Sequence, residues 1–186
     1  MDLDRAIEIV SSRVQLRGKS DHDLLTRVMK APDFVASPKV LSPADGLTDS
    51  VEVRPFEALH LLSLVTRPRY QDDLPDMYVQ WGLLRYLGFF DLLKTKDPVP
   101  ALKVSEAGCR IVGNQRRVAS EEMGIAFGVL LAIHWTKRTG AAGVPISIVD
   151  IDAALDDRYA FAGGARRAVR TVGTQRPDYL LIATDP

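Results

Sequence analysis

The segment 75–112 constrains the fold most, because its sequence predicts a helix, two strands and a second helix in succession within a short length of chain. Pro75 suits a first helical turn, and the apolar positions after it predict a helix that ends at a glycine. Segments 89–93 and 102–104 are then expected as two strands around a turn that holds two lysines and two prolines. Ser105 can cap the short helix that follows, which is expected to run to Gly113. The segment therefore predicts a helix followed by a β-hairpin and a second, short helix.

More helices are expected before this segment. Residues 2–17 place apolar side chains at helical spacing and predict one amphipathic helix, and a shorter helix is expected from Asp21 or Asp23 to Val28. The stretch 31–49 contains three prolines and one glycine with little periodicity, which is typical of a linker. A helix from Pro55 that stops before Pro68 begins the second part of the chain.

Charge and cysteine content narrow the class of protein. The 24 basic and 24 acidic side chains cancel, so any contact with nucleic acid must come from a local patch. The single cysteine, Cys109, cannot form an internal disulfide and lacks the paired spacing of a zinc site, which favours a reducing compartment. The acidic N-terminus does not resemble a signal peptide, and no uninterrupted apolar run is long enough to span a membrane. The chain is predicted to be cytoplasmic, without a membrane partner.

Two short sequences within segment 75–112 carry a family resemblance. They are Leu-Arg-Tyr-Leu-Gly-Phe at 84–89 and Leu-Lys-Val-Ser-Glu-Ala-Gly at 102–108. They resemble the end of the recognition helix, the wing strand and the following helix of winged-helix DNA-binding domains. The resemblance implies a domain over 51–118, with one helix in the major groove and a wing on phosphate, a variant of helix-turn-helix docking. The residues it marks as DNA contacts are Gln80 and Arg85 on the helix and Lys94, Lys96 and Lys103 on the wing.

A third part, residues 119–186, is expected as a partial α/β unit. Ser120 is expected to cap a helix whose first turn holds Glu121 and Glu122, where acidic side chains favour the helix dipole. The helix is apolar on nearly every side, so it should be largely buried. The side chains of this helix that are expected to be buried are Phe127, Leu130 and Leu131. Short strands are expected at 146–151 and 179–183.

The phrase Arg-Pro-Asp-Tyr-Leu-Leu-Ile at 176–182, after a helix with an acidic start, resembles the opening of a PD-(D/E)XK restriction-endonuclease-like domain. The resemblance implies a metal ligand at Asp178, catalytic assistance from Glu121 or Glu122, and Mg²⁺ as the cofactor of a longer form. The family's next strand should carry an acidic residue, a spacer and a lysine, and no such triplet follows Asp178. A fragment of a longer protein, a degenerate domain and a false resemblance all remain open, and the chain alone is expected to be inactive as a nuclease.

These observations predict an α+β protein in which a helical arm and linker, residues 1–50, precede the winged helix and the partial α/β unit. The expected function is binding of double-stranded DNA, as the recognition part of a restriction or defence nuclease. The alternatives are a transcriptional regulator without enzymatic activity and a scaffold whose winged helix binds protein. Homodimer formation stays open.

Overall fold

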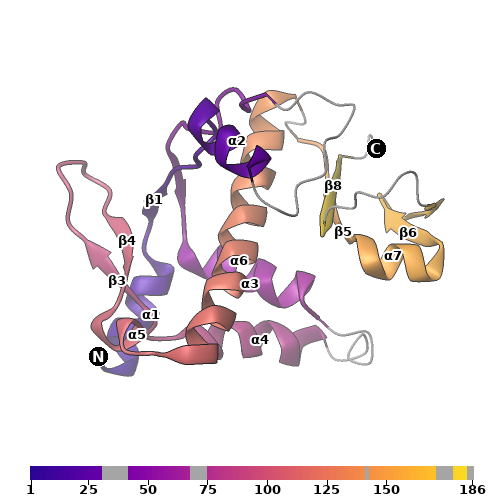
Figure 1. Ribbon diagram of the computed structural model, residues 1–186. Coiled ribbons are helices and arrows are strands. Elements are labelled where there is room, and N and C mark those ends of the chain that lie inside the picture. The colour runs from indigo at the N-terminus through magenta and orange to yellow at the C-terminus, as the bar shows by residue number, and fades with distance from the viewer. Residues whose placement is uncertain (31–41, 68–74, 141–142, 171–177, 184–186) are drawn as a thin grey trace. The chain divides into compact units, whose positions relative to one another are not determined.

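The computed structural model describes residues 1–30, 42–67, 75–140, 143–170 and 178–183 (Figure 1). It is a mixed α+β protein, as the sequence predicts, with 49% helix, 21% strand and small sheets. Contacts within the chain divide it into two units. The first combines Met1–Arg17 with Ser50–Leu131, and the second combines Gly18–Asp49 with Ala132–Pro186.

The first unit holds most of the helices. Its strands form one sheet in the order β2-β1-β4-β3, in which β3 and β4 are an antiparallel hairpin. In chain order its elements are α1 (Leu3–Ser11), β1 (Val14–Leu16), β2 (Val51–Val53), α3 (Pro55–Val65), α4 (Pro75–Tyr86), β3 (Phe90–Leu93), β4 (Ala101–Val104), α5 (Glu106–Cys109) and the first part of α6 (Gly113–Thr139).

One hydrophobic core joins the helices of this unit to its sheet. The side chains at its centre come from elements that are far apart in sequence, and each of them is almost fully removed from water. Burial of this kind contributes about 25 cal/mol for each Å² of apolar surface, so the core supplies the main driving force for folding. Its members are Ile9, Val10, Val14, Val53, Ala58, Leu59, Leu62, Tyr86, Phe90, Ala119, Ala126 and Leu130.

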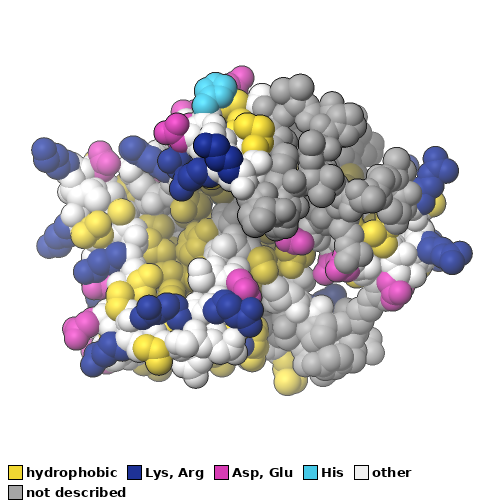
Figure 2. Space-filling model, viewed as in Figure 1, with side chains coloured by type: hydrophobic (Ala, Val, Ile, Leu, Met, Phe, Trp, Pro, Cys, Tyr) yellow, Lys and Arg dark blue, Asp and Glu magenta, His cyan; other side chains and the backbone are white. Residues whose placement is uncertain are grey.

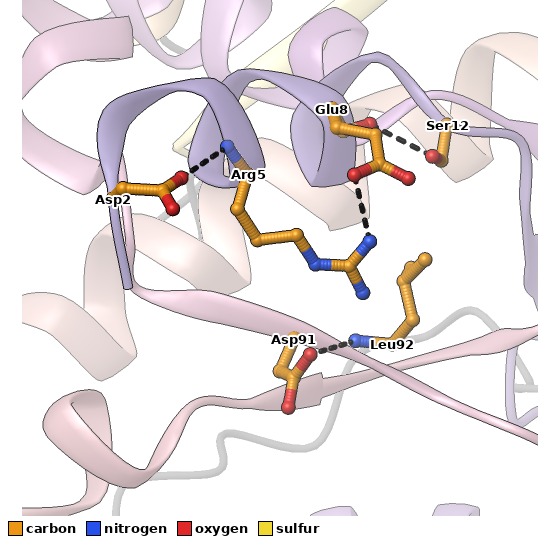
Figure 3. Close-up of polar contacts among 6 residues, drawn as sticks. All are labelled: Asp2, Arg5, Glu8, Ser12, Asp91 and Leu92. Atoms are coloured by element: carbon orange, nitrogen blue, oxygen red, sulfur yellow. Dashed lines mark hydrogen bonds and ion pairs between the residues drawn. The ribbon is translucent and has the colours of Figure 1, made fainter.

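The N-terminal helix is shorter than the sequence predicts. Asp2 caps it by accepting a hydrogen bond from the Arg5 backbone N–H at 2.8 Å (Figure 3), and it ends at Ser11 instead of continuing to residue 17. Val14 has helical spacing from Val10 in the sequence, but it is buried in β1 and pairs with Val53 of β2. Pairing of β1 with β2, which lies more than thirty residues later in the chain, has overridden the local helical pattern.

The helices and strands around the hairpin follow the prediction closely. Helices α3 and α4 begin at the two predicted prolines, and β3 and β4 lie within one residue of the predicted strands. Ser105 caps α5 as expected by accepting a hydrogen bond from the Gly108 N–H at 3.0 Å. However, α5 ends at Cys109, before the predicted stop at Gly113.

Helix α6 differs most from the prediction. It begins at Gly113, so Ser120 lies inside the helix and is not its N-cap, and Glu121 and Glu122 are not in its first turn. Leu130 is buried as expected, whereas Phe127 and Leu131 are only half-buried.

The length of α6 also bears on membrane association. Among the residues described, α6 is the one helix long and apolar enough to cross a membrane by length and composition. A single helix of this kind also occurs in the cores of soluble proteins, and α6 supplies Ala119, Ala126 and Leu130 to the first unit's core. The cytoplasmic location stays a prediction.

The second unit has a smaller core. It contains α2 (His22–Met29), the last turns of α6, β5 (Ile146–Asp150), α7 (Ile151–Asp157), the hairpin of β6 (Tyr159–Ala162) and β7 (Ala165–Ala168), and β8 (Tyr179–Ala183). Strands β5 and β8 pair antiparallel, and both lie where the sequence predicts strands. Helix α2 matches the predicted short helix and is capped by Asp21. Of the predicted linker, residues 31–41 lie outside the described residues.

Within this unit the C-terminal end of α6 is fastened to the turn at residues 44–49. The indole N–H of Trp135 donates to the Asp45 carbonyl at 2.8 Å, and Arg138 donates to the Gly46 carbonyl. The Arg138 guanidinium also lies 3.4 Å from the Asp49 carboxylate. These contacts connect segments about ninety residues apart, and sequence periodicity carries no signal for them.

Candidate nucleic-acid interface

Helix α4, the predicted recognition helix, is held close to α3 by a glycine. A Cβ built on Gly82 would lie 1.8 Å from the Ser63 hydroxyl oxygen and 2.9 Å from the Leu59 carbonyl oxygen. A side chain at this position would therefore separate the two helices. The close packing on this face leaves the opposite face of α4 toward solvent, where Met77, Gln80, Trp81, Leu84 and Arg85 are exposed.

Arg85, a predicted groove contact, already has partners within the first unit. Its Nη2 lies 3.1 Å from Glu122 Oε1 on α6, and its guanidinium lies over the Trp81 ring, 4.8 Å from the centroid. Glu122 keeps 18% of its side chain exposed, so this ion pair is partly shielded from water. DNA binding through Arg85 would compete with Glu122 for the same charge.

Tyr86 completes the cluster by donating its hydroxyl proton to the Glu122 carboxylate. Burial, reinforced by this hydrogen bond, raises the pKa of Tyr86 to about 12. The phenol therefore stays neutral, and Glu122 connects α6 to the C-terminal end of α4. The structure gives Glu122, a predicted catalytic residue, this role in joining two helices.

The hairpin of β3 and β4 presents its lysines in two different settings. Lys103 faces Asp91 across the strand pair, with Nζ 3.3 Å from Asp91 Oδ2. The pKa of Asp91 is lowered mainly by a hydrogen bond from the Leu92 backbone N–H (Figure 3). The contact with Lys103 lowers it further. Lys94 and Lys96 lie between the two strands and are exposed, and no ion pair to either is found among the described residues.

A cavity of about 440 Å³ lies beside the turn of the hairpin. Its lining combines apolar side chains with Arg5 of α1, Lys94 and Asp97. Arg5 is engaged with Glu8 at 2.8 Å (Figure 3), and the opposite charges of Lys94 and Asp97 cancel, so the lining has no net charge once Arg5 is paired. This cavity adds a recess with a mixed polar and apolar lining to the hairpin surface.

The chain after the hairpin extends its positive charge. Residues 94–117 hold six basic and two acidic side chains, although the whole chain is neutral. Figure 2 shows Lys and Arg side chains along the part of the first unit where Figure 1 places the hairpin and α5. Arg110, Arg116 and Arg117 were not predicted as contacts from the sequence, although a charge count over this window would have indicated them.

The remaining predicted catalytic residues have ordinary surface environments. Glu121 is exposed and lies 3.8 Å from Arg117 one helical turn earlier. Asp178 is exposed just before β8, and its backbone carbonyl accepts from the Ile151 N–H at 3.1 Å. Within the described part of the chain, no group of three or more His, Cys, Asp or Glu side chains is placed to hold a metal ion. Metal binding at Asp178 and catalysis by these carboxylates stay predictions.

Comparisons with known proteins do not add a family. Neither protein-family models, nor curated proteins, nor solved structures give a significant match to the chain. Function is therefore inferred from the geometry of the chain itself.

Proposed function

We propose that this protein binds double-stranded DNA through α4 and the β3–β4 hairpin of a winged-helix domain. The observation that carries the proposal is the exposure of Lys94 and Lys96 at the turn of a hairpin that follows a solvent-facing helix. In the winged-helix arrangement these two elements are the ones that meet the duplex. Lysines that are not engaged in an ion pair can replace the counterions of DNA phosphates.

The pairing of the charges ranks the predicted contacts. Lys94 and Lys96 lead, because Lys103 must give up Asp91 and Arg85 must give up Glu122 before either can bind phosphate or base. Gln80 is exposed on α4 and can accept and donate hydrogen bonds at a base edge. We expect phosphate contacts to dominate the affinity, with few side chains reading sequence.

The test compares lysines of the same hairpin. Binding to a dye-labelled duplex is measured by fluorescence anisotropy over a range of salt concentrations for the natural chain, the Lys94→Ala/Lys96→Ala variant and the Lys103→Ala variant. The double variant should bind unrelated sequences more weakly, and its salt slope should be lower by about 0.9 for each phosphate that the missing lysines neutralised.

Lys103→Ala is the matched control, because it removes a lysine that Asp91 already neutralises, and it should change the slope less. An affinity and slope unchanged in the double variant would remove the hairpin from the interface. If the natural chain showed no salt-dependent binding at all, the proposal itself would be wrong.

A protein-binding role is the second candidate, and the apolar face of α4 favours it. Met77, Trp81 and Leu84 lie at positions i, i+4 and i+7, and Met77 and Leu84 each keep 66% of their surface exposed. A stripe of this kind is typical of a helix that packs against a protein partner. Leu84→Glu should abolish self-association or partner capture if this stripe is the interface, and should weaken DNA binding if α4 meets the duplex, because Leu84 shares its face with Gln80 and Arg85. Sedimentation velocity and the same anisotropy titration separate the two outcomes.

A further inference from the structure

A second cavity, of about 410 Å³, lies between the base of the hairpin, α5 and the first turns of α6. This volume falls in the range of about 300–1,000 Å³ that is usual for small-molecule sites. Most of its lining is apolar, from Phe89, Val104, Ile111, Ala119 and Met123. The polar side chains in the lining are Arg116 and Ser120, and Cys109 also belongs to the lining.

The wall formed by α5 is fixed by two hydrogen bonds of the Ser105 hydroxyl and by a close approach at Gly108. The Ser105 hydroxyl donates to the Gly88 carbonyl at 2.8 Å and accepts from the Gly108 N–H at 3.0 Å. A Cβ on Gly108 would lie 2.7 Å from the Val104 side chain and 2.8 Å from the Phe89 carbonyl oxygen. The short helix is therefore packed directly onto the hairpin base, and the cavity is largely formed before any ligand arrives.

The charge of the lining is positive. Arg116 Nε donates to the Ile111 carbonyl at 3.1 Å, and its Nη2 reaches the Cys109 carbonyl at 3.4 Å, so the backbone orients the guanidinium. A guanidinium has five N–H donors, and these two bonds leave donors for another acceptor. Among the nine described residues that line the cavity, none is acidic.

From this combination we propose that the cavity binds a small organic anion with an aromatic or branched apolar body. The apolar body would occupy the space over Phe89, Ile111 and Met123, and the carboxylate or sulfonate would accept from Arg116 and Ser120. A charge-assisted hydrogen bond to a guanidinium is stronger than one between neutral groups, so it would select anions over neutral molecules of the same shape. This ligand site does not depend on DNA binding.

The first experiment uses two probes that differ by one charge. Anilinonaphthalene sulfonate has an aromatic body and an anionic group, and phenylnaphthylamine has the same rings without the sulfonate. Both become fluorescent in apolar surroundings, so each can be titrated against the folded protein. The anionic probe should bind more tightly, and equal affinities would overturn the assignment of an anion site.

Three variants test whether the binding occurs in this cavity. Arg116→Ala should weaken the anionic probe by about two- to fivefold and leave the neutral probe unchanged, as expected for a partly exposed charge contact. Arg117→Ala removes the same charge from a side chain that lies outside the lining, and it should bind both probes as the natural chain does. Ser120→Phe adds an aromatic ring at an exposed lining position and should weaken both probes.

Cys109 supplies a readout that does not rely on fluorescence. It is the single cysteine of the chain and is exposed, so alkylation by iodoacetamide, followed by mass spectrometry, reports on this wall alone. The anionic probe should slow alkylation in the natural chain and in Arg117→Ala, and should give less protection in Ser120→Phe. Probe binding that leaves the alkylation rate unchanged, or protection that persists fully in Ser120→Phe, would place the probe elsewhere and overturn the proposal.

Discussion

Gly82 occupies the point where α3 and α4 come closest, and this contact makes the first prediction. Gly82→Ala would place a methyl group against the Ser63 hydroxyl and the Leu59 carbonyl, both of which belong to the packed interior of α3. Overpacking of this kind costs about 1–3 kcal/mol. We expect a corresponding loss in the free energy of unfolding, measured by urea denaturation.

The same exchange at Gly124 is the control for the Gly82 experiment. Gly124 lies inside α6, and a Cβ there would meet nothing within 4 Å. Alanine is favoured over glycine in a helix by about 0.5–1 kcal/mol, so Gly124→Ala should stabilise the protein. If both variants behaved alike, the close approach of α3 and α4 would not be a feature of the folded protein.

Tyr86 predicts how stability depends on alkaline pH. The pKa of its hydroxyl is raised from 10.0 to about 12 by burial and by the hydrogen bond to Glu122. Below pH 10 both folded and unfolded chains keep the proton, so the stabilisation is complete. Between the two values the unfolded chain loses the proton first, and the stability attributable to Tyr86 falls as the pH rises.

The measurement compares urea unfolding of the natural chain with that of Tyr86→Phe at neutral and alkaline pH. The variant should lose about 1 kcal/mol at neutral pH, the usual net value of one hydrogen bond, and should fall less steeply above pH 10. The pKa of Tyr179 is also raised by burial, but it is common to both chains and cancels in the comparison. Parallel pH profiles would contradict the assignment to Tyr86.

Glu122 shows which features of single residues the sequence could not reveal. Its position after Ser120 and Glu121 is typical of a helix start, and the prediction followed that local pattern. This pattern did not determine where the helix begins, because the same residues also occur inside helices. The chain is already helical from Gly113. Its partners Arg85 and Tyr86 lie about 36 residues away in sequence, and no periodicity marks a contact of that range.

At the scale of secondary structure, local signals predicted the elements that have both a start and a stop residue. Helices α3 and α4 begin at prolines, and the hairpin strands flank a turn-rich segment, so their bounds were predicted to within about two residues. The errors arose where tertiary pairing decides the outcome. Val14 continues a helical pattern in the sequence but lies in β1, because it pairs with Val53 of the distant strand β2.

Helix α6 allows a prediction about element packing with a matched leucine. Leu130 is 4% exposed in the core of the first unit, whereas Leu84 on α4 is 66% exposed. Leu130→Ala should cost about 2–5 kcal/mol, the usual range for a buried leucine. Leu84→Ala should change the free energy of unfolding by less than about 0.5 kcal/mol, as surface substitutions do. Similar losses in thermal and urea unfolding for the two variants would mean that α6 does not pack as described.

At the scale of the whole molecule, the neutral net charge determines how the proposed DNA binding should respond to salt. A chain with 24 basic and 24 acidic side chains produces no long-range positive field, so attraction must act locally at residues 94–117. Binding should therefore be moderate and strongly dependent on salt near the physiological range. Composition alone gave this expectation, but only the structure shows that Lys103 and Arg85 form ion pairs with Asp91 and Glu122. No ion pair to Lys94 or Lys96 is found among the described residues.

The two units should differ in local stability, because their described cores differ in size. The core of the first unit contains twelve buried hydrophobic residues from helices and sheet, and that of the second contains four, Val149, Ile151, Ala154 and Ala160. Backbone amides in a region with few buried apolar contacts open at lower free energy and exchange faster with solvent. Hydrogen exchange followed by mass spectrometry should show slow exchange in α3 and the buried part of α6, and faster exchange in the paired strands β5 and β8. Val149→Ala should speed exchange in β5 and β8 further, since it removes apolar contacts from the smaller core. Protection in β5 and β8 equal to that in α3 would show that burial in the second unit is more extensive than its described core.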